Sequence, residues 1–173
     1  MLRTTLFSVA CVMCLPTAAE QSCDTSQYPL SAPSDRFLDN GDGTITDRVT
    51  LLMWMRCSQG QKWSGNACEG TPSRYDWAGA RAVAEQVNDA GQSFFDDWRL
   101  PSLTEIAAIA ERQCTDPRIN LDVFPDTPPG FYWSNSPRPK DDDAVYALGF
   151  GDQGVAPVAK QEALHVRLVR TGP

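Results

Sequence analysis

The chain has a single histidine, His165, so any imidazole-dependent catalysis would have to use it. It lies in residues 164–170 (LHVRLVR), where apolar and polar residues alternate as in a half-buried strand, and its side chain is predicted to point outward. Ser134 and Ser136 are candidate nucleophiles, but no nucleophile-elbow pattern surrounds them. A lone exposed histidine without convergent groups indicates no catalytic residue.

Carboxylates gather around the DWRLP turn at residues 97–101. Glu105 follows Ser102 by three residues, which is the spacing of a helix capping box. We expect Arg99 to pair with Asp96 or Asp97, which favours a structural ion-pair network over acid–base chemistry. The residues assigned architectural roles are Trp98, Arg99, Pro101, Ser102 and Glu105.

The segment DNGDGTITD at residues 39–47 imitates the middle of an EF-hand calcium loop. Aligning Gly43 with the glycine of such a loop puts Asn40 and Asp42 at ligand positions. The same alignment puts Leu38 and Val49 where two essential oxygen ligands belong, and no helix pattern flanks the segment. Because N-G and D-G steps typify tight hairpins, the segment is predicted to be a turn, and no metal or cofactor is expected.

The first 19 residues have the pattern of a signal peptide, with Arg3 followed by an apolar run at residues 6–15 and small residues before position 20. The run is too short to span a bilayer. Cys11 and Cys14 fall inside it, so their C-x-x-C spacing indicates no redox or metal site. We expect an exported chain, in the periplasm or at the cell surface, divided into a signal peptide (1–19), an extended arm (20–35) and one domain (36–170).

Four cysteines remain after residue 19, and an even number in an exported protein predicts two disulfides with three alternative pairings. Cys57 and Cys68 bracket a short polar loop, which favours a local bridge between them. Cys23 and Cys114 would then tie the arm to the end of a helix. Zinc is disfavoured, because no two of these cysteines have finger spacing.

Aromatic and charged side chains in loops are the candidates for ligand binding, because binding residues concentrate on loops held by a rigid scaffold. Two of them lie between Cys57 and Cys68, and others lie near a loop between two expected strands. An acidic run at 141–143 follows, and we interpret it as a solvated face. The candidate ligand-binding residues are Lys62, Trp63, Tyr132, Arg138, Lys140 and Tyr146.

The length and net charge of the chain limit the number of domains and the classes of partner that it can have. The 173 residues are enough for one domain with a core, and a formal net charge of −7 argues against nucleic-acid or other polyanion partners. A hairpin is expected around residues 36–47, a strand at 50–56, a helix at 77–88 ending near Gly91, a second helix from 103 to about 113, and strands at 131–135, 144–150 and 164–170. Strands, then two helices, then strands indicate an α+β domain.

Several phrases in this order resemble one bacterial family, typified by the C-terminal domain of the Legionella collagen-like adhesin. They are RFLDNGDGTITDRVTLLMW, CSQGQKWSGNACEG, YDWAGA, DWRLPSLTEI, CTDPRINLDVFPDTP, FYWSNSP and HVRLVR. The resemblance covers about residues 36–170 and implies a C-type-lectin-like fold. Named members of this family are adhesins or ligand-binding surface modules, and one of them binds sulfated glycans. The resemblance therefore implies a ligand-binding role for this chain, and it is compatible with a homo-oligomer.

Activities of similar folds fit this chain poorly. Formylglycine-generating enzymes need paired cysteines late in the chain, and no cysteine follows Cys114. The calcium-chelating strings of true C-type lectins do not occur. We therefore expect an exported, non-catalytic module that binds a glycan or an envelope protein. The alternatives are an envelope protein binding one protein partner through its acidic face, or an enzyme with a carboxylate-dependent site.

Overall fold

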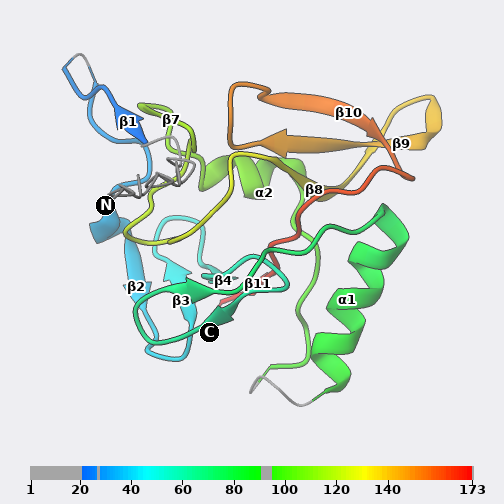
Figure 1. Cartoon of the computed structure of the whole chain (residues 1–173), viewed down its shortest axis with the longest axis horizontal. Helices are drawn as coiled ribbons and strands as arrows, with labels where there is room; N and C mark the ends of the chain where they lie inside the picture. Colours follow the sequence, from blue (N-terminus) through cyan, green and yellow to red (C-terminus); the bar gives the residue numbers. More distant parts are fainter. Residues whose placement is uncertain (1–20, 27, 91–94, 173) are drawn as a thin grey trace, which may run out of the picture.

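The computed structural model describes residues 21–26, 28–90 and 95–172. The expected signal peptide and the expected helix stop at Gly91 lie outside these residues. The described part contains two helices and short antiparallel sheets (Figure 1), and its buried apolar side chains form two clusters. The α+β class and the presence of two disulfides are confirmed.

One sheet joins the beginning of the domain to its end. Strands β2 (Phe37–Asp39), β3 (Thr44–Asp47), β4 (Leu52–Met55) and β11 (Val169–Thr171) lie in the order β11-β4-β3-β2, all antiparallel. The β2–β3 connection is the predicted hairpin turn. Gly41 and Gly43 both adopt positive φ there, and Asp42 Oδ1 accepts hydrogen bonds from the backbone amide and hydroxyl of Thr44. Its polar groups are thus used to close the turn.

A second sheet contains β8 (Phe131–Arg138), β9 (Asp141–Gly149) and β10 (Val155–Ala159), in the order β10-β9-β8. Strands β8 and β9 were expected, although both extend further toward the turn between them. Strand β10 was not expected, because Pro157 removes a backbone donor and a central proline argues against a strand. It is tolerated here because β10 is an edge strand.

The helices begin where their caps predict. Helix α1 (Trp77–Asp89) starts after Asp76, whose carboxylate accepts a hydrogen bond from the Gly79 amide. Helix α2 (Leu103–Ala108) starts with the predicted capping box of Ser102 and Glu105. It ends five residues before the expected Gln113, because the chain turns there so that Glu111 can bind the N-terminal arm.

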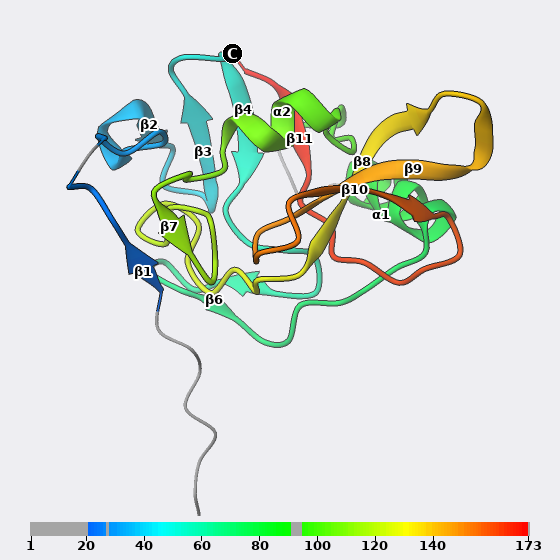
Figure 2. The same ribbon diagram turned by 90° about the horizontal axis from the view of Figure 1, so that it is seen from above.

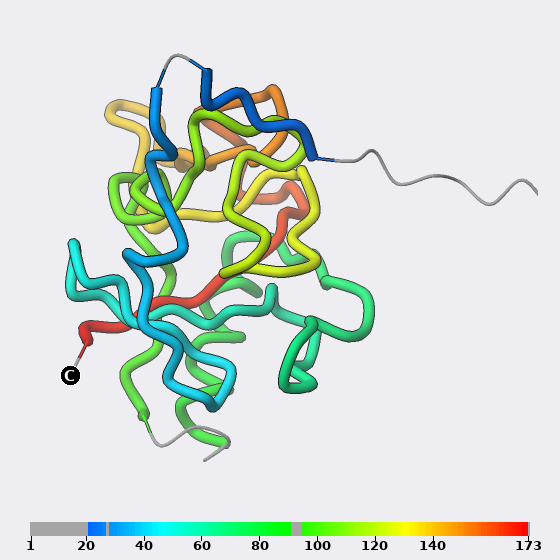
Figure 3. Tube along the Cα trace, turned by 90° about the vertical axis from the view of Figure 1, so that its left-hand side faces the viewer, coloured from blue at the N-terminus to red at the C-terminus, as the bar shows by residue number. Residues whose placement is uncertain are grey.

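The arm is fixed along the domain. Strand β1 (Ser22–Cys23) pairs with β7 (Cys114–Thr115), and the Cys23–Cys114 disulfide joins them as expected. A short 3₁₀ helix, η1 (Ser34–Arg36), leads into β2. Between β1 and η1, the backbone amides of Ser31 and Ala32 donate hydrogen bonds to the buried Glu111 carboxylate. Burial raises the pKa of Glu111, but these hydrogen bonds outweigh it and hold the pKa below the ordinary value. Figures 2 and 3 show the arm running beside the β7 segment.

Residues 164–168 differ from the expected half-buried strand. They cross the molecule from the α1 side to β11 (Figure 1). They form isolated bridges, Leu164 with Tyr75 and His165 with Tyr132, and the carbonyls of Val166 and Leu168 accept the backbone amides of Gln59 and Met55. Elements therefore cover this segment on several sides, and both His165 (4% exposed) and Arg167 (0%) are buried. The expectation that His165 points to solvent is wrong.

Of the tryptophans expected in the core, Trp54, Trp98 and Trp133 are buried, whereas Trp77, the first residue of α1, is half-buried. Pro101 is also buried, as its architectural role requires. Neither of the two described helices has the length and apolar composition needed to cross a bilayer.

Candidate ligand-binding site

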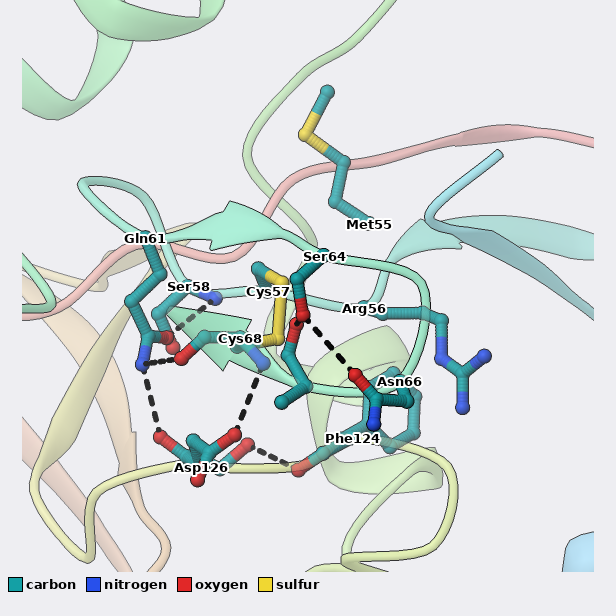
Figure 4. The surroundings of a disulfide bond; sticks show 12 residues. Met55, Arg56, Cys57, Ser58, Gln61, Ser64, Asn66, Cys68, Phe124 and Asp126 are labelled. Carbon is teal, nitrogen blue, oxygen red and sulfur yellow. Dashed lines mark hydrogen bonds between the residues drawn. A yellow bond between two sulfur atoms is a disulfide. The ribbon is translucent and has the colours of Figure 1, made fainter. Parts of the chain in front are cut away.

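The loop closed by the second disulfide forms a small β-ladder. Strand β5 (Lys62–Trp63) pairs with β6 (Cys68–Glu69), with Trp63 opposite Cys68. The Cys57–Cys68 disulfide, expected from the sequence, closes the loop with a Cα–Cα distance of 5.4 Å (Figure 4). Lys62 and Trp63 therefore lie on a strand, and their backbone directions are fixed.

Two side chains fasten this loop to the segment at residues 122–127. The Gln61 amide nitrogen donates to the backbone carbonyls of Cys68 and Asp126, and its carbonyl accepts the Ser58 amide. The Asp126 carboxylate accepts the Cys68 amide at 2.9 Å. Figure 4 shows these bonds meeting below the disulfide. Asp126 adopts φ 54°, a conformation that costs a non-glycine residue energy, so the surrounding bonds must hold it.

Trp63 rests on a buried cation. The Arg56 guanidinium lies 4.2 Å from the Trp63 ring centroid. Arg56 also bonds the Asp39 carboxylate at 2.7 Å and the carbonyls of Val123 and Asp122. Its charge and donors are thus committed inside the protein, where they fix one face of the indole.

A cavity of about 410 Å³ opens between this loop and the β2–β3 turn, a volume in the ordinary range for small-molecule sites. The half-exposed Trp63 and the exposed Lys62 stand on one side, and the exposed Asp42 stands on the turn. A side chain at Gly43 would collide with Trp63, since a Cβ there would lie 2.9 Å from the Trp63 Cβ. The lining residues are Asp42, Gly43, Thr44, Met55, Cys57, Ser58, Gln59, Gln61, Lys62 and Trp63.

A buried polar network lies behind the inner wall. The Ser58 hydroxyl lies 2.6 Å from the Tyr132 hydroxyl. Arg167 donates from Nη2 to Thr127 Oγ1 at 2.7 Å and to Ser58 Oγ at 3.4 Å, and from Nη1 to the carbonyls of Met55 and Arg56. Burial raises the pKa of Tyr132, and the positive charge of Arg167 opposes that shift.

His165 lies on the far side of the Tyr132 ring, with centroids 5.3 Å apart. Its Nε2 accepts from Arg74 Nε at 3.4 Å, and its Nδ1 lies 3.3 Å from the Ser73 carbonyl. Burial lowers the pKa of His165, and the charges of Arg74 and Arg167 lower it further. The neutral form of the imidazole is therefore favoured. The candidate nucleophiles are also engaged, since the Ser134 hydroxyl donates to the Tyr146 carbonyl and the Ser136 hydroxyl accepts the Leu103 amide.

The six sequence candidates do not come together. Lys62 and Trp63 line the cavity. Tyr132 is fully buried, so the expectation of an exposed aromatic at that position is wrong, because strand β8 turns this ring into the core. Tyr146 is half-buried on β9, opposite Pro157 of β10. Arg138 and Lys140 lie at the β8–β9 turn, outside the cavity lining.

The ion pairs around the DWRLP turn differ from the expectation. Arg99 pairs with both Glu105 carboxylate oxygens, at 2.7 and 2.8 Å, and this bond holds the pKa of Glu105 low. Asp97 pairs instead with Arg170 at 2.5 Å. The capping box fixes Glu105 over the helix end within reach of Arg99, and that geometry decides the pairing. Within the described ranges, no group of three or more histidine, cysteine or acidic side chains could hold a metal ion.

The sequence also matches a known family. Residues 43–170, most of the chain and nearly all of the cavity lining, match the Lcl C-terminal domain. The chain belongs to this family. A search of curated proteins found no match. The Lcl C-terminal domain match includes the Cys57–Cys68 loop and the buried network, whereas Cys23 and the arm precede it.

Sequence reasoning missed Ser58 and Arg167. Arg167 occupies a polar position in an alternating segment, which is the usual pattern of an outward side chain. Ser58 follows a cysteine without a motif. The one available indication was the arginine itself, flanked on both sides by buried aliphatic residues near the end of the chain.

Proposed function

We propose that the chain is an exported, non-catalytic recognition module of the bacterial envelope, adhesin-like, whose ligand occupies the cavity beside the Cys57–Cys68 loop. The observation that carries the proposal is the rigid mounting of Trp63. Its ring is stacked on Arg56, its strand is closed by a disulfide, and its remaining surface lines a cavity. Aromatic side chains fixed before binding lose little entropy when a ligand arrives.

Three further features support this account. Membership of the Lcl C-terminal domain family suggests an adhesin-like role. Two disulfides are consistent with export, because such bonds persist in oxidising compartments. His165 is buried and both of its ring nitrogens contact protein groups, which favours a structural role for this residue.

A C-type-lectin-like arrangement belongs to the same proposal. The pairing of β11 with β4 supports it, because this pairing brings the end of the domain back beside its beginning. The cavity lies between the β2–β3 turn and the disulfide-closed loop that follows β4.

A binding screen of residues 20–173 tests the function. It uses neutral and sulfated glycans, with calcium and with chelator, together with purified envelope components. Trp63→Ala is compared with Tyr28→Ala, which removes an aromatic ring that is 63% exposed on the arm, outside the cavity lining. We expect a ligand whose binding Trp63→Ala abolishes and Tyr28→Ala leaves unchanged. A ligand bound equally by both variants would place recognition elsewhere.

A further inference from the structure

A groove of about 540 Å³ runs along one side of helix α1, which lies at the periphery of the molecule (Figure 1). Residues from the second half of the helix form one wall, and Gln59 and Tyr75 form the other. Every lining residue is half-buried or exposed, so a ligand in the groove can touch each of them. The groove differs from the cavity beside the Cys57–Cys68 loop, since of their lining residues the two share only Gln59.

Backbone hydrogen bonds hold the wall opposite the helix. The Gln59 amide donates to the Val166 carbonyl at 2.9 Å, and the Ser73 amide donates to the Gln59 carbonyl at 2.8 Å. Tyr75 and Leu164 form an antiparallel bridge, in which each amide bonds the other carbonyl at 2.9 Å. Both walls are therefore ordered before a ligand arrives, which lowers the entropic cost of binding.

The helix wall of the groove is aliphatic. Val83, Val87 and Ala90 follow one another at spacings of four and three residues, so their side chains share one side of the helix. The residues of α1 that are buried in the core are Ala80 and Ala84. Val83 is half-buried and lies outside both buried clusters and the side chains packed against them. Its methyl groups are therefore available to an apolar side chain of a ligand.

The polar side chains of the helix wall have no partners among the residues that the structure describes. Neither the Asp89 carboxylate nor the Gln86 amide group makes a hydrogen bond or an ion pair there, and both residues are exposed. Of the described residues that line the groove, Asp89 is the only charged one, and no basic residue lies in the last turn of α1. The groove is therefore uncharged along most of its length and negative near the C-terminal end of the helix.

The length of the groove matches a short extended peptide. From Val83 to Ala90 the helix rises about 10 Å, which is the length of about three residues of extended chain. The point midway between Val83 and Val87 lies about 6 Å along the axis from Asp89. Side chains two residues apart in an extended chain point to the same side and lie about 7 Å apart. One such side chain can therefore lie over the valines while the other reaches Asp89.

We infer that this groove binds an extended segment of a partner protein, with an apolar side chain on Val83 and Val87 and a basic side chain at Asp89. The formal net charge of −7 also attracts a basic partner at long range. A saccharide fits less well, because the aliphatic wall offers its hydroxyl groups no hydrogen-bond partner. The inference goes beyond the proposed function, since it adds a second surface that does not depend on the Trp63 cavity.

Three tripeptides test the chemistry of the bound segment. Acetyl-Leu-Ala-Lys-amide carries both features, acetyl-Leu-Ala-Glu-amide reverses the charge, and acetyl-Ser-Ala-Lys-amide removes the apolar side chain. Each is titrated to millimolar concentration into ¹⁵N-labelled residues 20–173 while the amide resonances of α1 from Val83 to Ala90 are followed. We expect the first peptide to shift these resonances with an affinity about threefold or more above that of either other peptide.

Variants locate the contact. Asp89→Asn removes an exposed charge and should weaken binding of the first peptide about threefold, with loss of its preference over the charge-reversed peptide. Val83→Ala removes two methyl groups from the wall and should weaken binding about fivefold, while alanine favours the helix. The matched controls are Asp142→Asn at the β8–β9 turn and Val49→Ala, whose side chain is 73% exposed outside the groove lining. Both controls should leave the affinity unchanged.

Trp63→Ala separates this inference from the proposed function. This variant should bind the first peptide as the wild-type chain does, because Trp63 does not line the groove. Loss of peptide binding in a folded Trp63→Ala protein would place the peptide in the cavity and overturn the groove as its site.

The titrations can also contradict the inference directly. No shift of the α1 amides with any peptide, or equal affinities for all three, would overturn it. Affinities that stay unchanged in both Val83→Ala and Asp89→Asn would place the peptide elsewhere on the surface. Maltose serves as a neutral saccharide probe, and α1 shifts with maltose but with none of the peptides would assign the groove to a saccharide.

Discussion

Two surface segments carry similar side chains but are built differently. The loop at residues 57–68 carries Lys62 and Trp63, and the β8–β9 turn carries Arg138, Lys140 and three aspartates. The first is closed by a disulfide and bonded to residues 122–127. The second is held by a half-exposed pair between Arg138 and Asp141 at 2.9 Å and by Lys160, which donates to the Asp142 carbonyl. The β8–β9 turn therefore carries exposed charges without rigid support, whereas the loop at residues 57–68 forms a fixed wall of the cavity.

The largest loss should follow from opening the disulfide that closes the first segment. The double variant Cys57→Ser, Cys68→Ser removes a crosslink across 11 residues, for which loop-closure entropy gives about 3 kcal/mol. Denaturation with an intact Cys23–Cys114 bond, verified by mass spectrometry, measures the loss. An unchanged unfolding free energy would mean that Gln61 and Asp126 hold the loop without the crosslink.

Removing an arginine from each segment sharpens the same contrast. Arg56→Ala leaves the Asp39 carboxylate and two backbone carbonyls without their partner and takes away the support of Trp63. The Asp39 carboxylate is 59% exposed and is resolvated by water, so the cost comes from the backbone carbonyls that lose their donor. We expect a loss of about 2 kcal/mol in the free energy of unfolding, measured by urea denaturation. Arg138→Ala, the matched change in the turn, should cost less than about 0.5 kcal/mol, because exposed pairs contribute little. Equal losses would remove the contrast.

Asp126 tests the bonds beneath the loop separately. Asp126→Asn keeps the size of the side chain and weakens the acceptor for the Cys68 amide. We expect a loss of about 1 kcal/mol, typical of one hydrogen bond, and faster amide exchange at Cys68. Asp142→Asn in the turn is the control and should leave exchange in both segments unchanged. Faster exchange at Cys68 in the control would contradict the separation of the two segments.

Acid should destabilise the protein through His165, whose ring lies beside Tyr132 in the core. His165 has a folded pKa below 6.5, so its contribution to stability is complete above that pH and is lost as pH falls from about 6.5 toward the folded value. The free energy of unfolding should therefore decline in this range in wild type. His165→Gln, which cannot titrate, should flatten the decline. A decline of the same slope in His165→Gln would assign it to other groups.

The local parts of this molecule were predictable from the sequence. Helix starts follow from caps at Asp76 and Ser102, and the hairpin follows from two glycines in a turn. The disulfide pairing followed from the short spacing of Cys57 and Cys68. Each of these is decided by residues within a few positions of one another.

What depends on distant contacts could not be predicted. The alternation at residues 164–170 suggests one covered face, but the segment crosses between two sheets and is covered on several sides. That burial turned His165 and Arg167 inward and placed Arg167 behind Ser58, about 110 residues away in sequence. Of the residues that line the cavity, Lys62 and Trp63 were sequence candidates for ligand binding, whereas the residues of its inner wall were not.

The most direct test of the account is the binding of a ligand by Trp63→Ala beside the wild-type chain. The ligand is the best binder from the glycan and envelope screen, and affinity is measured by calorimetry. The account predicts that Trp63→Ala folds with both disulfides intact and loses binding by about a hundredfold, as expected for a central aromatic contact. Unchanged affinity in a folded Trp63→Ala protein would contradict it.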